Sequence, residues 1–198
     1  MAIRYGFEIE AKGQTAPLFT QVHGDIVHEV TNPEAMRKDP QAGDGGYTFA
    51  PGVEISVFTA DCFPLLFFTD RGIAAVHAGW RGMANGIPLR ALEKLKVTGD
   101  DYRLVIGPAI LSCCFEVKED FLAAFEEKGR PIYDFIDKRD GRMFCRLDDF
   151  LLDGLLGDVP PAQVISQHKR CTVCSTPQLP SYRRNKGTDP RIRSWIQR

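Results

Sequence analysis

The pattern of apolar and polar positions predicts a chain built mainly of short strands. Runs rich in β-branched and aromatic residues have strand-like lengths and are bounded by turn residues. The stretch 31–46 is rich in Asn, Pro, Asp and Gly, so we expect a loop there. The expected strands span residues 4–9, 19–23, 26–30, 54–59, 64–69, 73–78, 103–106 and 163–166.

Three further segments have the spacing of amphipathic helices. In the first of them, apolar residues such as Ile87, Leu92 and Leu95 recur at roughly helical intervals. The expected helices span residues 83–95, 119–127 and 147–156. Strands and helices in this mixture predict an α/β fold, a single-domain layered α/β sandwich with a mixed β-sheet over residues 1–198.

Composition and charge restrict the classes of function. The 198 residues are 43% hydrophobic and 26% charged, as in ordinary globular proteins, and they suffice for one core. The net charge of -1 provides no field toward nucleic acid or anionic lipid. The apolar runs are too short to span a bilayer, and no secretory signal is present at the N-terminus. We therefore expect a cytoplasmic protein with no nucleic-acid or membrane partner.

Two imidazoles and one thiol stand at the ends of predicted strands, in His23, Cys62 and His77. This is a metal-ligand set, and three protein ligands leave a fourth position open, as in a catalytic zinc site. Asp61 stands beside Cys62 and could orient a ligand imidazole. The spacing alone does not distinguish a metal site from a structural role, because two hydrogen-bonded core histidines and a buried thiol would give the same pattern.

The chain has 6 cysteines, and a cytosol would keep them reduced. Cys171 and Cys174 form one Cys-x-x-Cys motif without a second such motif to complete a four-cysteine site. A redox pair and half a metal site are open interpretations, but a structural role is favoured. Either Cys113 or Cys114 is a candidate fourth ligand that would close the histidine site.

Several longer motifs occur in a fixed order along the chain. They are Gln-Val-His at 21–23, Thr-Ala-Asp-Cys-Phe-Pro at 59–64, His-Ala-Gly-Trp-Arg-Gly at 77–82, a Gly-Pro-Ala-Ile to Cys-Cys-Phe-Glu-Val segment at 107–117, and Ser-Tyr-Arg-Arg at 181–184. On these motifs the chain resembles the YfiH/laccase-domain family, also called the multicopper polyphenol oxidase family and the purine nucleoside phosphorylase family. The resemblance extends from about Gln21 to the C-terminus.

The resemblance implies a layered α/β fold and a zinc ion held by His23, Cys62 and His77, with copper as an alternative metal. It also implies phosphorolysis of adenosine, inosine, guanosine and S-methyl-5'-thioadenosine, together with deamination of adenosine. Arg81 is implied as a functional residue, and the partners would be a purine nucleoside and phosphate. Relatives have a longer region before Gln-Val-His, whereas about twenty residues precede Gln21; if that region helps to bind the nucleoside or phosphate, activity or substrate range would differ here.

The chemistry of the residues allows three functions. For phosphorolysis, Arg81 can clamp phosphate bidentately and Asp61 can serve as a general base or orienting group. A copper polyphenol oxidase could use the same two imidazoles and thiolate, but a laccase needs a further cluster built largely from histidine. The chain has only 4 histidines, which argues against a self-sufficient multicopper oxidase. A non-catalytic, zinc-stabilised binding module is the third reading, if a fourth protein ligand closes the site.

Overall fold

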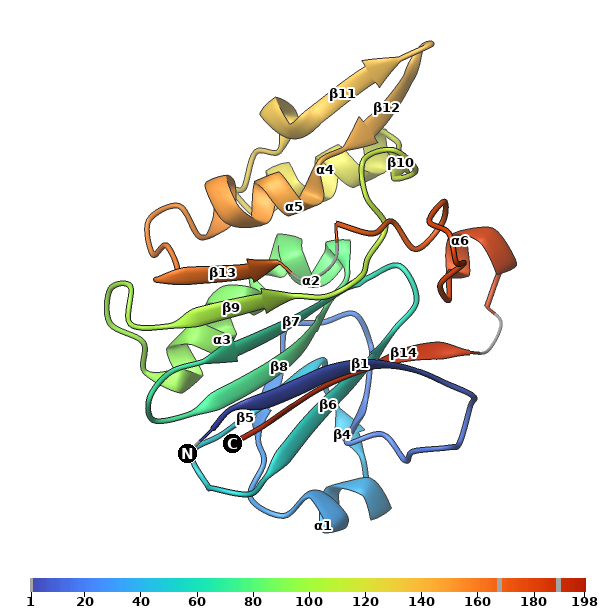
Figure 1. Ribbon diagram of the computed structural model, residues 1–198. Coiled ribbons are helices and arrows are strands. Elements are labelled where there is room, and N and C mark those ends of the chain that lie inside the picture. The colour runs from blue at the N-terminus through green and yellow to red at the C-terminus, as the bar shows by residue number, and fades with distance from the viewer. Residues whose placement is uncertain (1, 167–168, 188–189) are drawn as a thin grey trace.

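The computed structural model describes residues 2–166, 169–187 and 190–198, and its centre is a mixed six-stranded sheet (Figure 1). The two outermost strand pairs are parallel and the inner pairs are antiparallel. In spatial order the strands are β13 (Gln163–Ser166), β9 (Arg103–Ile106), β7 (Phe63–Phe68), β8 (Ile73–Ala78), β5 (Gly45–Thr48) and β3 (Val27–Glu29). The mixed α/β fold expected from the sequence is confirmed.

A smaller antiparallel sheet covers one face of the central sheet. Its strands, in spatial order, are β1 (Arg4–Glu10), β14 (Arg191–Gln197) and β6 (Glu54–Thr59). Leu66 and Phe68 of β7 belong to the apolar cluster that this sheet closes with Ile55 and Ile196. The pairing of β1 with β14 places the two termini close together, as Figure 1 shows.

Helices cover the opposite face of the central sheet. Because side chains alternate along a strand, Leu65 and Phe67 of β7 pack into this second cluster, together with Ile87 and Leu92. The helical segments of this layer are α2 (Trp80–Asn85), α3 (Ile87–Leu95), α4 (Glu119–Glu127), α5 (Leu147–Asp149) and the π-helical turns η2 (Phe150–Leu155). No helix in the described ranges is long and apolar enough to cross a membrane.

The remaining elements are short. Three of them, β10 (Glu116–Val117), β12 (Arg142–Cys145) and β11 (Ile136–Arg139), form a small antiparallel sheet, and β2 (Phe19–Thr20) pairs with β4 (Gln41–Ala42) in parallel. The others are α1 (Pro33–Lys38), η1 (Tyr133–Phe135) and α6 (Tyr182–Asn185).

The loop expected at 31–46 was wrong, because the segment contains α1, β4 and the start of β5. Asn32 caps α1 by accepting a hydrogen bond from the Ala35 amide at 3.1 Å. Strand β5 has glycine at positions 45 and 46, where neighbouring side chains leave no room for a Cβ. A Cβ at Gly45 would lie 2.5 Å from Val76 Cγ1. A strand that needs glycine lacks the side chains by which strands are predicted.

The helix expected at 83–95 is two helices. Gly86 has a φ of 84°, a left-handed conformation that ends α2, and α3 begins at the next residue. The basic segment at the C-terminus also contains a strand, β14, that sequence reasoning missed. In β14, Ile192 and Ile196 are buried, but so is Arg193, and this charge obscures the apolar pattern.

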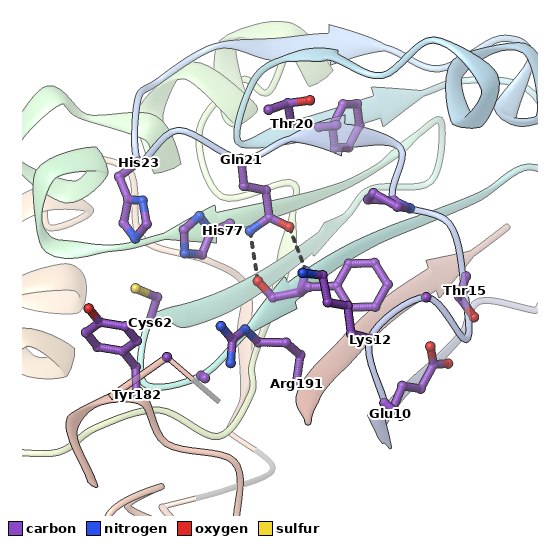
Figure 2. Close-up of a pocket in the computed structure, with 17 residues that line it drawn as sticks. Glu10, Lys12, Thr15, Thr20, Gln21, His23, Cys62, His77, Tyr182 and Arg191 are labelled. Atoms are coloured by element: carbon purple, nitrogen blue, oxygen red, sulfur yellow. Dashed lines mark hydrogen bonds between the residues drawn. The ribbon is translucent and has the colours of Figure 1, made fainter. Parts of the chain in front are cut away.

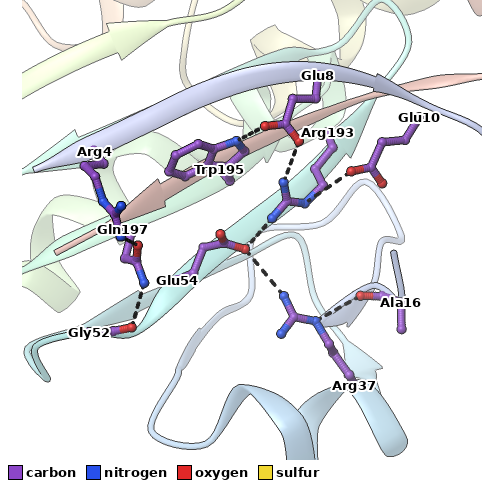
Figure 3. A network of polar contacts seen from close by, with 10 residues as sticks. All are labelled: Arg4, Glu8, Glu10, Ala16, Arg37, Gly52, Glu54, Arg193, Trp195 and Gln197. Carbon is purple, nitrogen blue, oxygen red and sulfur yellow. Dashed lines mark hydrogen bonds and ion pairs between the residues drawn. The ribbon is translucent and has the colours of Figure 1, made fainter. Parts of the chain in front are cut away.

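Buried Arg193 joins all three strands of the smaller sheet through ion pairs (Figure 3). Its guanidinium lies 2.9 Å from Glu8 Oε2 and 3.7 Å from Glu10 Oε1, and it also donates to Glu54. Glu10 is itself buried. If one partner of this network were removed, a buried charge would remain with neither a counter-ion nor water around it. The network therefore holds the three strands in one arrangement.

We expect Arg193→Met to lower the free energy of unfolding by about 3 kcal/mol, because it removes the guanidinium shared by Glu8, Glu54 and buried Glu10. Denaturant unfolding monitored by circular dichroism measures this. Arg103→Met is the matched control: its pair with Asp70 is exposed and 3.9 Å long, so the loss there should stay below about 1 kcal/mol. Equal losses in the two variants would contradict a special role of the buried network.

Candidate metal centre

The structure brings His23, Cys62 and His77 together. His77 is on β8, Cys62 lies in the turn between β6 and β7, and His23 lies between β2 and β3. One nitrogen of each imidazole and the sulfur all lie within 4.8 Å of one another, and the two rings meet edge to face with centroids 4.7 Å apart. Three segments distant in sequence therefore present a metal-ligand set at one point.

Asp44, which sequence reasoning did not single out, holds two of these segments. Its Oδ1 lies 2.7 Å from His77 Nδ1, which leaves Nε2 as the nitrogen available to a ligand. The same carboxylate accepts hydrogen bonds from the backbone amides of Val22, His23 and Gly24. Asp44 has no exposed surface, so the contact is protected from water. It lies in the segment expected to be a loop, where only its charge distinguished it.

The Gln21 side chain anchors the segment that leads into His23 to strand β6. Its amide donates to the carbonyl of Phe58 and accepts from the amide of Phe58, both at 2.8 Å (Figure 2). The side chain thus pairs with the edge of β6 as a short strand would. This contact gives a physical reason for Gln two positions before the ligand His23.

Contacts within the candidate site shift the pKa values of Cys62, His77 and Asp44. Burial alone would raise the pKa of Cys62, but contacts with His23 and His77 lower it to about 7. Burial alone would lower the pKa of His77, but hydrogen bonds to Asp44 and Cys62 raise it to about 9. Burial opposes ionisation of Asp44 too, yet its bonds to His77 and Gly24 lower its pKa. A thiolate beside imidazoles is thus favoured.

These residues fit a zinc ion. One thiolate, two imidazoles and a carboxylate behind one imidazole form a common zinc donor set, and the position opposite them is open to a cavity. Gly79 preserves the space, since a Cβ there would lie 3.0 Å from His23 Cδ2 and 3.1 Å from Cys62 Sγ. Copper accepts the same donors.

The sequence suggested that Asp61 could orient a ligand imidazole, but both of its carboxylate oxygens accept hydrogen bonds from other groups. Its Oδ1 accepts from the Thr172 hydroxyl at 2.5 Å and its Oδ2 from the Arg183 amide at 2.6 Å. The acceptor at His77 is Asp44 instead. Asp61 has a φ of 91°, a strained conformation for a residue with a side chain, and such strain is typical of functional sites.

Two cavities meet at the candidate ligands. The larger, of about 780 Å³, contains His23, Cys62 and His77 in its wall (Figure 2). The smaller, of about 280 Å³, shares His23 and Cys62 with it and is also lined by Asp61 and Arg81. The wall of the larger cavity also includes Glu10, Lys12, Phe19, Phe58, Tyr182 and Arg191. A molecule in either cavity can thus approach the candidate ligands.

Arg81 projects from the first turn of α2 into the smaller cavity. Its guanidinium lies 4.1 Å from the centre of the Trp80 ring, a cation–π contact that orients the side chain. Within the described part of the chain, no carboxylate pairs with it.

A second cluster of metal-binding side chains consists of Cys113, Cys114, Cys171 and Cys174. Their sulfurs all lie within 4.8 Å of one another, so the cluster could bind a metal. The Cys-x-x-Cys motif therefore has a second pair after all, supplied by two adjacent cysteines. Neither Cys113 nor Cys114 joins the histidine site, where each was a candidate fourth ligand.

The chain belongs to the family whose description is multi-copper polyphenol oxidoreductase laccase, since the family model matches residues 6–198. Proteins named purine nucleoside phosphorylase are similar to it. One from Aquifex aeolicus is 33% identical over 177 residues, which is 89% of this chain and 80% of that protein. The protein YfiH of Escherichia coli, also named purine nucleoside phosphorylase, is 31% identical over 89% of this chain and 71% of its own.

A solved structure agrees with the fold. The crystal structure of the Neisseria meningitidis protein NMB0706 superimposes with a TM-score of 0.78 and 29% sequence identity. The match covers 90% of this chain and 73% of that one. The family membership that the motifs suggested is therefore confirmed.

We expect Cys62→Ser to remove the metal from the histidine site, because a hydroxyl is a much poorer zinc ligand than a thiolate. Metal analysis of the purified variant should show the loss of one equivalent of zinc per chain. Cys145→Ala is the control, since that thiol is buried and belongs to neither cluster. Full zinc occupancy in Cys62→Ser would show that the ligand assignment is wrong.

We expect Asp44→Asn to weaken zinc binding at the histidine site about 10- to 100-fold, because His77 loses the charge that fixes its ring and raises its basicity. Competition with a chelator of known affinity measures the change. Asp70→Asn, at an exposed turn, should leave the affinity unaltered. Unchanged affinity in Asp44→Asn would remove Asp44 from this role.

Proposed function

We propose that the chain is a zinc-dependent purine nucleoside phosphorylase. Its substrates in this proposal are adenosine, inosine, guanosine and S-methyl-5'-thioadenosine, and adenosine is also deaminated. The observation that carries the proposal is the position of His23, Cys62 and His77 between two cavities, one of which contains Arg81. The names of the similar proteins support the same activity.

The larger cavity suits a nucleoside. Its volume of about 780 Å³ lies within the range of small-molecule sites. Phe19, Phe58 and Tyr182 offer aromatic surface to a purine, while Glu10 and Lys12 offer polar groups to a ribose. Tyr182 lines both cavities and lies beside Cys62 in Figure 2, so a base stacked on it would lie next to the candidate ligands.

The smaller cavity suits phosphate. The planar Arg81 guanidinium can donate two parallel hydrogen bonds to one phosphate, and its stacking on Trp80 preserves that orientation. A phosphate oxygen forms the new bond to the ribose C1′ and the bond from C1′ to the purine nitrogen breaks. The bonding electrons leave with the purine, which takes up a proton. The products are the free base and ribose 1-phosphate.

The other polar groups act by positioning. Asp44 fixes the His77 imidazole, and Asp61 anchors Thr172 and Arg183 beside the smaller cavity. In this proposal Asp61 contributes to catalysis by holding that wall of the cavity in a fixed position relative to Cys62, the next residue in the chain. A zinc ion held by the three ligands would supply a Lewis acid and acidify water, which is the chemistry that adenosine deamination requires.

The copper polyphenol oxidase is the competing function, since the description of the family contains it. The same three side chains could hold one copper. With only 4 histidines, two of them at this site, the chain is poorly supplied for the additional cluster that a laccase needs. A binding module without catalysis is disfavoured because the candidate ligands face an open cavity and, among the described residues, no fourth protein ligand joins them.

We expect the purified protein to release free base from adenosine or inosine and to form ribose 1-phosphate only when phosphate is supplied. Chromatography of the products at several phosphate concentrations measures both. Inosine formed from adenosine without phosphate would report the deaminase activity separately. Oxygen uptake with phenols by a copper-loaded sample, with no purine release at any phosphate concentration, would favour the oxidase instead.

We expect Arg81→Lys to reduce kcat/KM for phosphate about 10- to 100-fold while the zinc content stays unchanged, since an ammonium cannot form two parallel hydrogen bonds. Initial rates at varied phosphate and metal analysis of the same sample give both quantities. Arg90→Lys on α3 is the control, because Arg90 pairs with Asp25 and Glu93 outside both cavities. An unaltered phosphate dependence in Arg81→Lys would exclude Arg81 as the clamp.

A further inference from the structure

We propose that the four-cysteine cluster of Cys113, Cys114, Cys171 and Cys174 binds a single zinc ion and that this ion braces the wall of the smaller cavity. It would be a second metal centre, separate from the histidine site. The proposal does not depend on the phosphorylase activity. It rests on the separation of the sulfurs, the hydrogen bonds and charges around them, and their connection to Asp61.

The separation of the sulfurs fits one tetrahedral ion. With zinc–sulfur bonds of about 2.3 Å, two thiolates on the same zinc lie about 3.8 Å apart. Cys113 Sγ and Cys174 Sγ are 3.6 Å apart, and every pair in the cluster is within 4.8 Å. In a polynuclear iron–sulfur cluster the four thiolates are divided among different irons, so some of them lie farther apart than this, and the geometry favours a mononuclear site.

Disulfides explain the cluster less well. A disulfide joins two sulfurs at about 2.05 Å and has no use for four sulfurs that approach one another mutually. Adjacent cysteines such as Cys113 and Cys114 do not easily bridge to each other.

Backbone amides surround one of the sulfurs in the manner that a thiolate requires. The Cys171 sulfur is hydrogen-bonded by the amides of Leu111, Val173 and Cys174. Two of these donors belong to the same Cys-x-x-Cys turn, and Leu111 belongs to the segment of the other pair. The two cysteine segments are thus already joined at the sulfur, before any ion is considered.

Cations lie around the cluster. Zinc with four thiolates carries a net charge of about −2, which needs nearby positive charge. Arg139 donates to the carbonyl of Ser112, Arg183 to that of Cys114, and Arg184 to that of Val173 at 2.7 Å. Three arginines, one from β11 and two from α6, therefore bind carbonyls that lie next to the four sulfurs.

The cluster is connected directly to the smaller cavity. Thr172, inside the Cys-x-x-Cys turn, donates its hydroxyl to Asp61, and its amide donates to the carbonyl of Ala109 at 3.0 Å. Asp61 precedes the candidate ligand Cys62, and Ile110 lines the cavity. An ion that fixes the turn would therefore fix Asp61, and its loss would loosen this wall.

The test is the metal content of the full chain purified under reducing conditions. We expect two zinc ions per chain. Cys113→Ser and Cys174→Ser, at exposed positions, should each retain one zinc, and Cys62→Ser should also retain one. The double variant Cys62→Ser/Cys174→Ser should retain none, while Cys145→Ala should keep both. Two zinc ions in Cys174→Ser, or iron in place of zinc, would overturn the proposal.

Cobalt substitution of the unmodified chain and of Cys62→Ser tests the ligands by spectroscopy. A tetrathiolate cobalt centre has intense sulfur-to-metal charge-transfer bands, which should persist in Cys62→Ser. Bands that disappear with Cys62→Ser would assign all cobalt to the histidine site and overturn the proposal. Thiol titration of the unfolded, metal-free chain should give all 6 cysteines free, and a lower count would favour disulfides.

The bracing role has its own readout. Cys174→Ser should melt at a lower temperature than the unmodified chain, and zinc added to the unmodified apoprotein should raise its melting temperature beyond the shift seen for Cys174→Ser. Hydrogen exchange of the amides of 109–114 and 171–175 should accelerate in the variant, with little change in the smaller sheet. Unchanged exchange in those segments would contradict the bracing role.

Discussion

The contact between Asp44 and His77 is the interaction on which the candidate site depends. It places a buried carboxylate against a buried imidazole, an arrangement that is stable only if the charges and hydrogen bonds are satisfied. The backbone supplies the further hydrogen bonds that this buried pair needs. The amides of residues 22–24 donate to the same carboxylate, and the His77 amide donates to the Asp44 carbonyl at 2.6 Å. One side chain thus fixes the strand that carries His77 and the loop that carries His23.

The layered fold determines where this contact lies. Along β8, Ala74, Val76 and Ala78 pack in the cluster beneath the helices, whereas Ile73 and Ala75 pack beneath the smaller sheet. The alternation directs His77 to the side of the smaller sheet, where the larger cavity opens beside Phe58 at the end of β6. Close approach of β5 to β8 at Gly45 brings Asp44 within reach. Packing that has nothing to do with metal binding therefore sets the geometry of the ligands.

Sequence reasoning found the parts of the molecule that carry local signals. The strands β7, β8 and β9 contain apolar runs, and the three candidate ligands stand in recognisable motifs. It missed Asp44 because a lone Asp among glycines has the composition of a loop, and its partner is 33 residues away. It missed β14 because Arg193 is buried by ion pairs that only the folded sheet supplies. The adjacent pair at 113–114 has no standard spacing, so its match with the Cys-x-x-Cys turn was visible only in three dimensions.

The two cysteine-containing centres are mechanically connected through one carboxylate. Both carboxylate oxygens of Asp61 accept hydrogen bonds, one from Thr172 in the Cys-x-x-Cys turn and one from the backbone amide of Arg183. Asp61 therefore joins two segments of the chain. A carboxylate committed to two strong donors is a weak candidate for a general base, because a proton taken up there would disrupt both bonds. The strained backbone of Asp61 persists because these bonds over-determine it. Cys62 is the next residue along the chain, so the hydrogen bonds of Asp61 also fix the position of Cys62. The geometry of the histidine site therefore depends on contacts made on the far side of the smaller cavity.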